Sequence, residues 1–168
     1  MNKHARNIAY GSLIAAMYAA LTHLQNLLIP GSATWAIQFR LSEALCILAF
    51  FTPAAIPGLG VGCFLFNLTY GAALPLDALL GTLATLLACG GMYLTRNITF
   101  RKIPVPGLAL PALTNSFLIG WELTACIGGA FALNALYVAI GELAVLFTLG
   151  LLLYATIKKR GIDRRLFG

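Results

Sequence analysis

Charge is scarce in this sequence. Only 10% of its 168 residues are Asp, Glu, Lys or Arg, whereas an average soluble domain has roughly 25%. Together with 60% apolar residues and a mean hydropathy of +0.89, this excludes a soluble globular enzyme, a disordered chain and a small disulfide scaffold. Long apolar stretches recur along the chain without the alternation that outer-membrane barrels need. The composition indicates an all-α polytopic membrane protein with one domain, residues 1–168.

Patterns for metal binding and catalysis are missing too. The four Cys residues form no CxxC pair and there are only two His residues, so we interpret the Cys side chains as small buried hydrophobes. The sequence contains no HExxH, GxSxG or DxxD motif. We therefore expect no metal site, no cofactor and no catalytic residue.

Pro, Gly and charged residues divide the chain into six apolar segments. We expect six transmembrane helices, at residues 8–29, 41–56, 58–71, 77–95, 108–126 and 134–157. The second and third are shorter than the roughly 20 residues that a span needs. Pro53, Pro57, Gly58 and Gly60 favour a break between them over one long helix.

The basic residues that give the net charge of +6 are distributed as the predicted topology requires. Six spans place both termini on one side, and every Lys and Arg except Arg40 then faces the cytoplasm, as the positive-inside rule requires. We therefore expect both termini to be cytoplasmic in a cell-membrane protein, with the bases serving topology and not nucleic acid. The first segment could also be a signal peptide, but five more apolar segments follow it, which favours an uncleaved span.

Acidic side chains mark the candidate site. An acid within a span costs roughly 2.5–3.5 kcal/mol and is a functional candidate by default. The six-span topology puts four acids in the outer half of the membrane: Glu43, Asp77, Glu122 and Glu142. Asn67 and Asn134 share this level and Asn115 lies near mid-depth. We expect an outward-facing pocket beneath the loop of residues 30–40, which carries Gln38 and Arg40.

The ligand type follows from these groups, although local alternatives exist. Trp35, Phe39, Trp121 and Tyr137 would wall the pocket or form an interfacial belt. Arg40 could simply pair with Glu43, and Asp77 could cap a helix. Carboxylates, amides and aromatic faces suit a small, planar, donor-rich, cationic molecule. A proton or ion relay would need acids in the inner half, where the spans have none.

The first segment also carries small residues at a spacing of four. Gly11, Ala15 and Ala19 form one series, and Ala16 and Ala20 another. This spacing makes a flat face that lets a helix approach closely, either from a partner protein or from this chain. Because the sequence has no ATP-binding motif, energised transport would need a partner.

Several motifs together resemble one known family. They are the stretch Gln38 to Leu45 (QFRLSEAL), Pro53 to Leu59, Gly62-Cys63 with Asn67, Asp77 with Gly81 to Thr85, and Leu110 to Ala112 with Asn115. These residues resemble the queuosine-precursor transporter (QueT) family, whose members are substrate-binding S components of energy-coupling factor (ECF) transporters. The resemblance covers nearly the whole chain.

The resemblance implies six helices and a vitamin-like ligand bound from outside. It also implies partners, namely a membrane coupling protein and two ATPases, with an AxxxA face on the first helix contacting the coupling protein. The implied ligand is a deazaguanine such as 7-aminomethyl-7-deazaguanine or queuine. Glu122 or Glu142 would then bind its guanine-like edge and Glu43 or Asp77 its ammonium. Gln38, Asn67 and Asn115 would bind remaining ring atoms, and Arg40 would orient Glu43 or the loop.

Other functions remain open at this point. A sister S component would bind a different vitamin. A stand-alone ion-coupled carrier would transport without ATPases, and a membrane assembly protein would have no small ligand.

Overall fold

The computed structural model describes residues 2–32, 37–71, 73–101 and 103–167. Within them the regular structure is helical, apart from an isolated bridge between Phe100 and Ile103, so the all-α prediction is confirmed. The helices are α1 (Lys3–Leu28), the 3₁₀ helix η1 (Leu41–Phe50), α2 (Ala55–Thr69), α3 (Asp77–Leu94), α4 (Val105–Cys126), α5 (Phe131–Val145), the π-helical η2 (Leu146–Gly150), α6 (Leu151–Lys159) and α7 (Ile162–Phe167).

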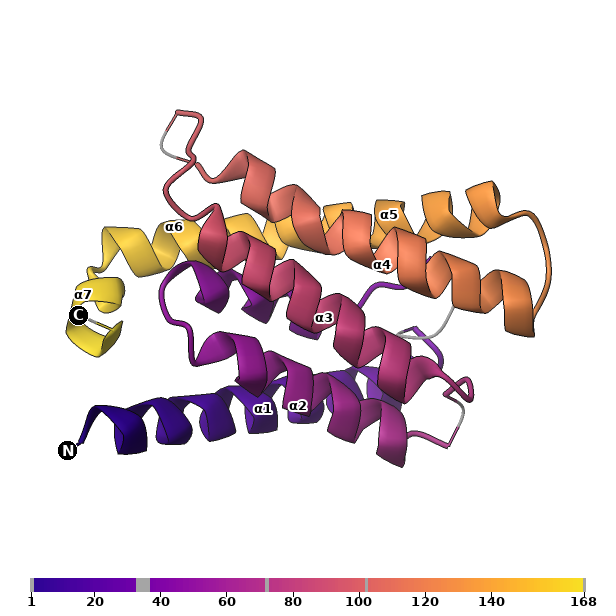
Figure 1. The fold of residues 1–168 in the computed structure, drawn as a ribbon, viewed down its shortest axis with the longest axis horizontal. Coiled ribbons are helices and arrows are strands. Elements are labelled where there is room, and N and C mark those ends of the chain that lie inside the picture. Colours follow the sequence, from indigo (N-terminus) through magenta and orange to yellow (C-terminus); the bar gives the residue numbers. More distant parts are fainter. Residues whose placement is uncertain (1, 33–36, 72, 102, 168) are drawn as a thin grey trace.

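The helix η1 forms the centre of the bundle. Helices α1 to α5 pack against one another in chain order (Figure 1), and η1 contacts α1, α2, α3, α5, η2 and α6. All its residues except Leu41 and Leu48 are buried. Apart from Ser42 and Glu43 the residues of η1 are apolar, and a helix of this composition belongs in an interior, which explains why this short segment is surrounded by the others.

The two ends of the bundle differ in charge. Both termini and the connection of residues 95–104 lie at one end, which we call the terminal end, on the left of Figure 1. The connections of residues 29–40, 70–76 and 127–130 lie at the other, which we call the distal end. Elements at the terminal end carry every described base except Arg40: Lys3, Arg6, Arg96, Arg101, Lys158, Lys159, Arg160, Arg164 and Arg165. An even number of passes through the bundle brings the termini together in this way.

A helix occupies each of the six predicted segments, but six full spans are not confirmed. By length and composition, two helical stretches among the described residues can cross a membrane: Asp77–Leu94 and the continuous rod Phe131–Lys159. The apolar helices η1 and α2 are shorter. Because a 3₁₀ helix rises about 2.0 Å per residue, the ten residues of η1 cover roughly 20 Å, still short of a hydrocarbon core of about 30 Å. Six crossings stay a prediction.

The break between the second and third segments lies earlier than predicted. It falls at residues 51–54, whereas Pro57, Gly58 and Gly60 lie inside α2. Pro57 is the third residue of α2, where its missing N–H has no intrahelical partner to lose. Gly58 instead serves helix packing, since a Cβ there would stand 2.6 Å from the carbonyl oxygen of Gly11 on α1.

The Gly58→Ala substitution should destabilise the α1–α2 crossing, because the added methyl group meets backbone and not a movable side chain. We expect a loss of roughly 1–3 kcal/mol, measured as a lower Tm in detergent. The matched control is Gly90→Ala in α3, where an added Cβ meets nothing within 4 Å. Gly90→Ala should be neutral or slightly stabilising, and an equal drop in both variants would contradict the packing argument.

Candidate functional site

Four buried acids from four helices meet in the distal half of the bundle. Glu43 lies in η1, Asp77 begins α3, Glu122 lies near the end of α4, and Glu142 lies in α5. Each is at most 3% exposed. The charge of Asp77 acts on Glu122 and that of Glu43 on Glu142. With Arg40 they form what we call the polar cluster.

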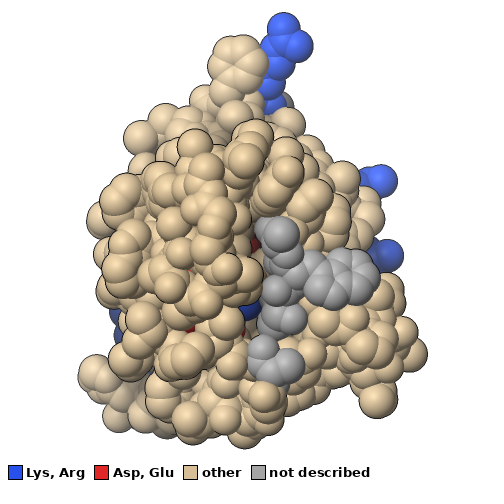
Figure 2. Space-filling view, turned by 90° about the vertical axis from the view of Figure 1, so that its right-hand side faces the viewer, with Lys and Arg blue, Asp and Glu red and all other residues tan. Residues whose placement is uncertain are grey.

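The polar cluster lies below the surface of the distal end. Figure 2 looks onto this end: Lys and Arg side chains project past its upper and right-hand edges, while the face itself is almost entirely uncharged, with small areas of red and blue deep between other side chains. Among the described residues no group of three His, Cys, Asp or Glu side chains could hold a metal ion. The cluster offers charged and hydrogen-bonding side chains.

Arg40 supplies positive charge to this cluster. Its side chain is buried, at 4% exposure, and the charges of Asp77 and Glu43 act on its guanidinium. The same charge also acts on Glu122 and Glu142. The alternative that Arg40 simply pairs with Glu43 therefore accounts for only part of its surroundings, because its charge acts on acids from several helices.

Arg40 reaches the interior because the chain enters the bundle before it becomes helical. Arg40 has extended backbone angles (φ −88°, ψ 102°) and directly precedes η1. The side chain of Gln25 on α1 holds this segment, donating to the Phe39 carbonyl and accepting from the Leu41 amide at 2.7 Å. Non-helical backbone at membrane depth requires such internal partners.

Glycine on α5 seats the same segment from the other side. The carbonyl oxygen of Gln38 occupies the position where a Cβ on Gly141 would stand. Gln38 itself is buried. The backbone of residue 38 therefore lies directly against α5, one residue before Glu142.

The carboxylate of Glu43 already has protein partners. One oxygen accepts a hydrogen bond from the Tyr18 hydroxyl and the other from the Cys46 thiol at 3.1 Å. Next to it, the Thr22 hydroxyl donates to Ser42 at 2.6 Å. Glu43 is thus fixed by α1 and by its own helix.

Asp77 is also held, but not as the helix cap that the sequence suggested. Leu76 is the N-cap residue of α3, and the Asp77 carboxylate accepts from the backbone N–H of Leu74 at 2.7 Å. As the first helical residue, Asp77 points back and satisfies a loop amide. Asn67 on α2 donates to the Asp77 carbonyl oxygen at 3.0 Å, which joins α2 to α3.

Several buried acceptors in the described part of the chain have no hydrogen-bond partner. They are both carboxylate oxygens of Glu122, the Oε2 of Glu142 and the Oδ1 of Asn67. The other oxygen of Glu142 accepts from Asn115 at 2.9 Å, which fixes the carboxylate. Buried polar groups are almost always paired, so three helices present acceptors that suit a donor-rich guest.

The structure leaves the predicted aromatic wall outside the cluster. Trp121 is 52% exposed and Tyr137 37% exposed, on the outer surfaces of α4 and α5, and Phe39 is also exposed. Trp35 lies outside the described residues. Asn134 does not join the acids either, because its amide donates to Thr124 and to the Gly128 carbonyl and so closes the α4–α5 turn.

Sequence reasoning missed the inner face of α1. Tyr18, Thr22, Gln25 and Asn26 are all buried there. Their spacing of four, three and one places them on one side of an α-helix, and polar residues on one side of an apolar helix were the available signal. Tyr18 is the aromatic side chain that actually reaches an acid.

The small residues of α1 divide between two faces. Gly11 and Ala15 pack against α2, since a Cβ on Gly62 would stand 2.8 Å from the Ala15 carbonyl oxygen. Ala16 and Ala20 are exposed and Ala19 is half-buried. For Gly11 and Ala15, the helix that approaches closely therefore belongs to this chain and not to a partner protein.

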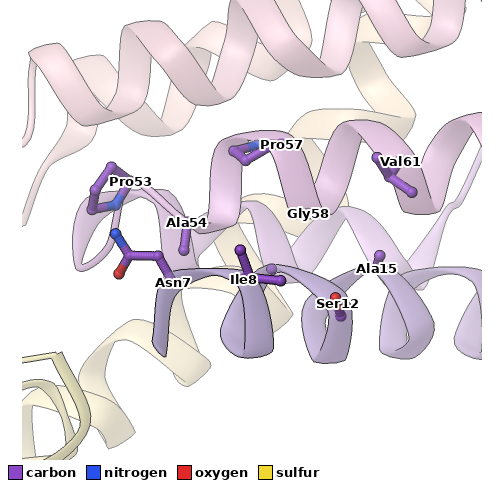
Figure 3. A pocket seen from close by; sticks show the side chains of 10 residues that line it. Asn7, Ile8, Ser12, Ala15, Pro53, Ala54, Pro57, Gly58 and Val61 are labelled. Carbon is purple, nitrogen blue, oxygen red and sulfur yellow. The ribbon is translucent and has the colours of Figure 1, made fainter. Parts of the chain in front are cut away.

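A groove of about 400 Å³ runs between α1 and the start of α2. Figure 3 shows Ile8, Ser12 and Ala15 of α1 facing Ala54 and Val61 across it. The groove is mainly apolar and contains none of the acids. It is a surface feature separate from the polar cluster.

The Gln25→Ala substitution should loosen the segment that carries Arg40. The variant removes one bond to Phe39 and one to Leu41, each worth about 1–3 kcal/mol when its partner stays buried. We expect amide hydrogen exchange in residues 38–41 to rise at least tenfold. The exposed neighbour Leu24→Ala is the control, and unchanged exchange in Gln25→Ala would refute the clamp.

Comparison with known proteins gives one match. The sequence profile of a family described as QueT transporter matches residues 8–159. No curated protein and no solved structure matches the chain. Because the matched region covers nearly the whole chain, this membrane protein belongs to the QueT transporter family.

Proposed function

We propose that this chain is the substrate-binding S component of an ECF importer and that it binds a queuosine precursor of the deazaguanine class. The observation that carries the proposal is the set of unpartnered buried acceptors on Glu122, Glu142 and Asn67. Family membership supports a transporter with a small-molecule substrate. The chain itself has no catalytic role in this proposal.

The acceptors suit the hydrogen-bonding edge of a deazaguanine. Its ring N–H and exocyclic amine form two parallel donors, and a carboxylate accepts such a pair bidentately. We assign this edge to Glu122 or Glu142, because their oxygens are available. An aminomethyl ammonium fits beside Asp77, whose charge already acts on Glu122, while Glu43 is bound by Tyr18 and Cys46. Gln38, Asn67 and Asn115 supply the remaining polar contacts.

The proposed orientation puts the distal end outside the cell. Six crossings with both termini in the cytoplasm give this arrangement, and the bases at the terminal end then follow the positive-inside rule. The ligand enters from the external side, past the segment of residues 38–40.

The energy source in this proposal is a partner assembly of one coupling protein and two ATPases. The exposed pair Ala16 and Ala20, one turn apart on α1, offers a flat face to a partner helix. Ser12 extends this face by one turn and borders the α1–α2 groove. We assign partner docking to this face and no longer to Gly11 and Ala15.

Purified protein should bind 7-aminomethyl-7-deazaguanine with a nanomolar Kd, equivalent to about −12 kcal/mol. Glu122→Gln and Glu142→Gln should each weaken binding at least tenfold, because a charge-assisted hydrogen bond contributes about 1.5–3 kcal/mol. Isothermal titration calorimetry measures both effects.

The control is Asp163→Asn, which removes a carboxylate paired with Lys158 at the terminal end and should leave the Kd unchanged. No binding of any deazaguanine below about 100 μM would remove the substrate class from the proposal. Wild-type affinity in both Glu variants would move the site elsewhere.

Ala16→Leu with Ala20→Leu should spare ligand binding and abolish uptake in cells, because bulk on this face blocks a close helix contact. Ala132→Leu with Ala155→Leu, also exposed, is the matched control on α5 and α6 and should transport normally. Normal uptake by the Ala16/Ala20 variant would reassign the docking face. Uptake by proteoliposomes that contain only this chain would instead establish a stand-alone carrier.

A further inference from the structure

Arg40 differs from every other described base of the chain. It is the buried one, and it lies in the distal half, whereas the others lie at the terminal end. A buried guanidinium is costly in a membrane protein and persists where acids compensate it. Its position therefore needs an explanation in terms of the acids around it.

Arg40 lies close to three of the elements that carry acids. Its Nη1 reaches α3 at Gly81, one turn after Asp77, where a Cβ would stand 4.0 Å from it. Glu43 follows it by three residues, and the backbone of Gln38, two residues before it, lies against Gly141 beside Glu142. The charges of Arg40 and of these acids act on one another. The acids come from helices, whereas Arg40 comes from a connecting segment.

A guanidinium and the edge of a deazaguanine have the same hydrogen-bonding pattern. Both are planar and both present parallel N–H donors to a carboxylate. A site that binds one has the acceptor geometry for the other. A cationic ligand can also replace the positive charge, which a neutral ligand cannot do.

The segment that carries Arg40 is not helical. The acids are on helices, whereas residues 38–40 are held by the side chain of Gln25 and by the bond from the Phe39 amide to the Ser32 carbonyl at 3.2 Å. The cluster is closed to the surface, since its members are at most 4% exposed.

We propose that Arg40 occupies the place of the ligand in the free protein. Its guanidinium compensates the four acids there, and a cationic ligand with a guanidine-like edge displaces it. This inference rests on the proposed function and adds a specificity-determining residue to it. Displacement exposes four carboxyl groups, so a ligand binds well when it brings both the donors and the positive charge.

The first test compares two ligands in one variant. Arg40→Gln should bind the cationic 7-aminomethyl-7-deazaguanine at least tenfold more tightly than the wild type, because nothing has to be displaced. Its affinity for the neutral 7-cyano-7-deazaguanine should not rise. Arg101→Gln, a base at the terminal end, should leave both Kd values unchanged. Unchanged or weaker binding of the cationic ligand by Arg40→Gln would show that Arg40 is a fixed counter-ion and overturn the proposal.

The second test uses the wild-type protein and does not depend on a variant folding. Phenylglyoxal modification, read by peptide mass spectrometry, should leave Arg40 unmodified in the free protein and modify it at saturating ligand. Arg101, exposed in the free protein, serves as the internal reference. Protection of Arg40 in the saturated complex would overturn the displacement.

A third measurement separates this inference from the proposed function. Methylguanidinium at millimolar concentration should raise the Tm of Arg40→Ala and not that of Arg101→Ala. If it does so while the wild type binds no deazaguanine, the substrate class fails and the guanidine-binding cluster stands. If deazaguanine binds tightly while methylguanidinium has no effect on the Tm of Arg40→Ala, the proposed displacement of Arg40 is wrong and the proposed function stands.

Discussion

One buried guanidinium and four buried carboxyl groups constrain how this bundle is put together. Because ionisable groups are costly in an apolar surrounding, each helix that carries one of these acids must turn it inward. That requirement selects the inner faces of η1, α3, α4 and α5 in the distal half. The base comes from the distal connection, where the chain enters the bundle with extended backbone angles at Arg40 before η1 begins.

Composition and charge order predicted much of the architecture, because hydrophobicity and topology act over long segments. The helical class and the helical segments follow from them. Detail that depends on tertiary contact did not follow. Gly58 and Gly60 predicted a break between two helices, but both lie inside α2 and serve close packing there. Gly58 packs against Gly11 of α1. Trp121 points outward because an aromatic side chain at this level is also stable at the membrane surface.

Specific side chains hold the segment that leads into the bundle before η1. Gln25 bonds to the segment of residues 38–41 from one side, and Gly141 lets it lie against α5 from the other. Breaking a few such contacts frees the segment without unwinding any helix. In the proposed function, this division lets the helices keep the acceptors in place while a short piece of chain moves.

The π-helical turn η2 has a consequence for the long rod from Phe131 to Lys159. Glu142 and Tyr154 are twelve positions apart, and at about 100° per residue they would point about 120° apart in an unbroken α-helix. The residue absorbed by a π turn reduces this difference to about 20°. Both side chains are in fact buried. The one extra residue in the π turn thus changes the direction in which all later side chains point around the helix axis. As a result, Glu142 and, farther along the same rod, Tyr154 can both face inward.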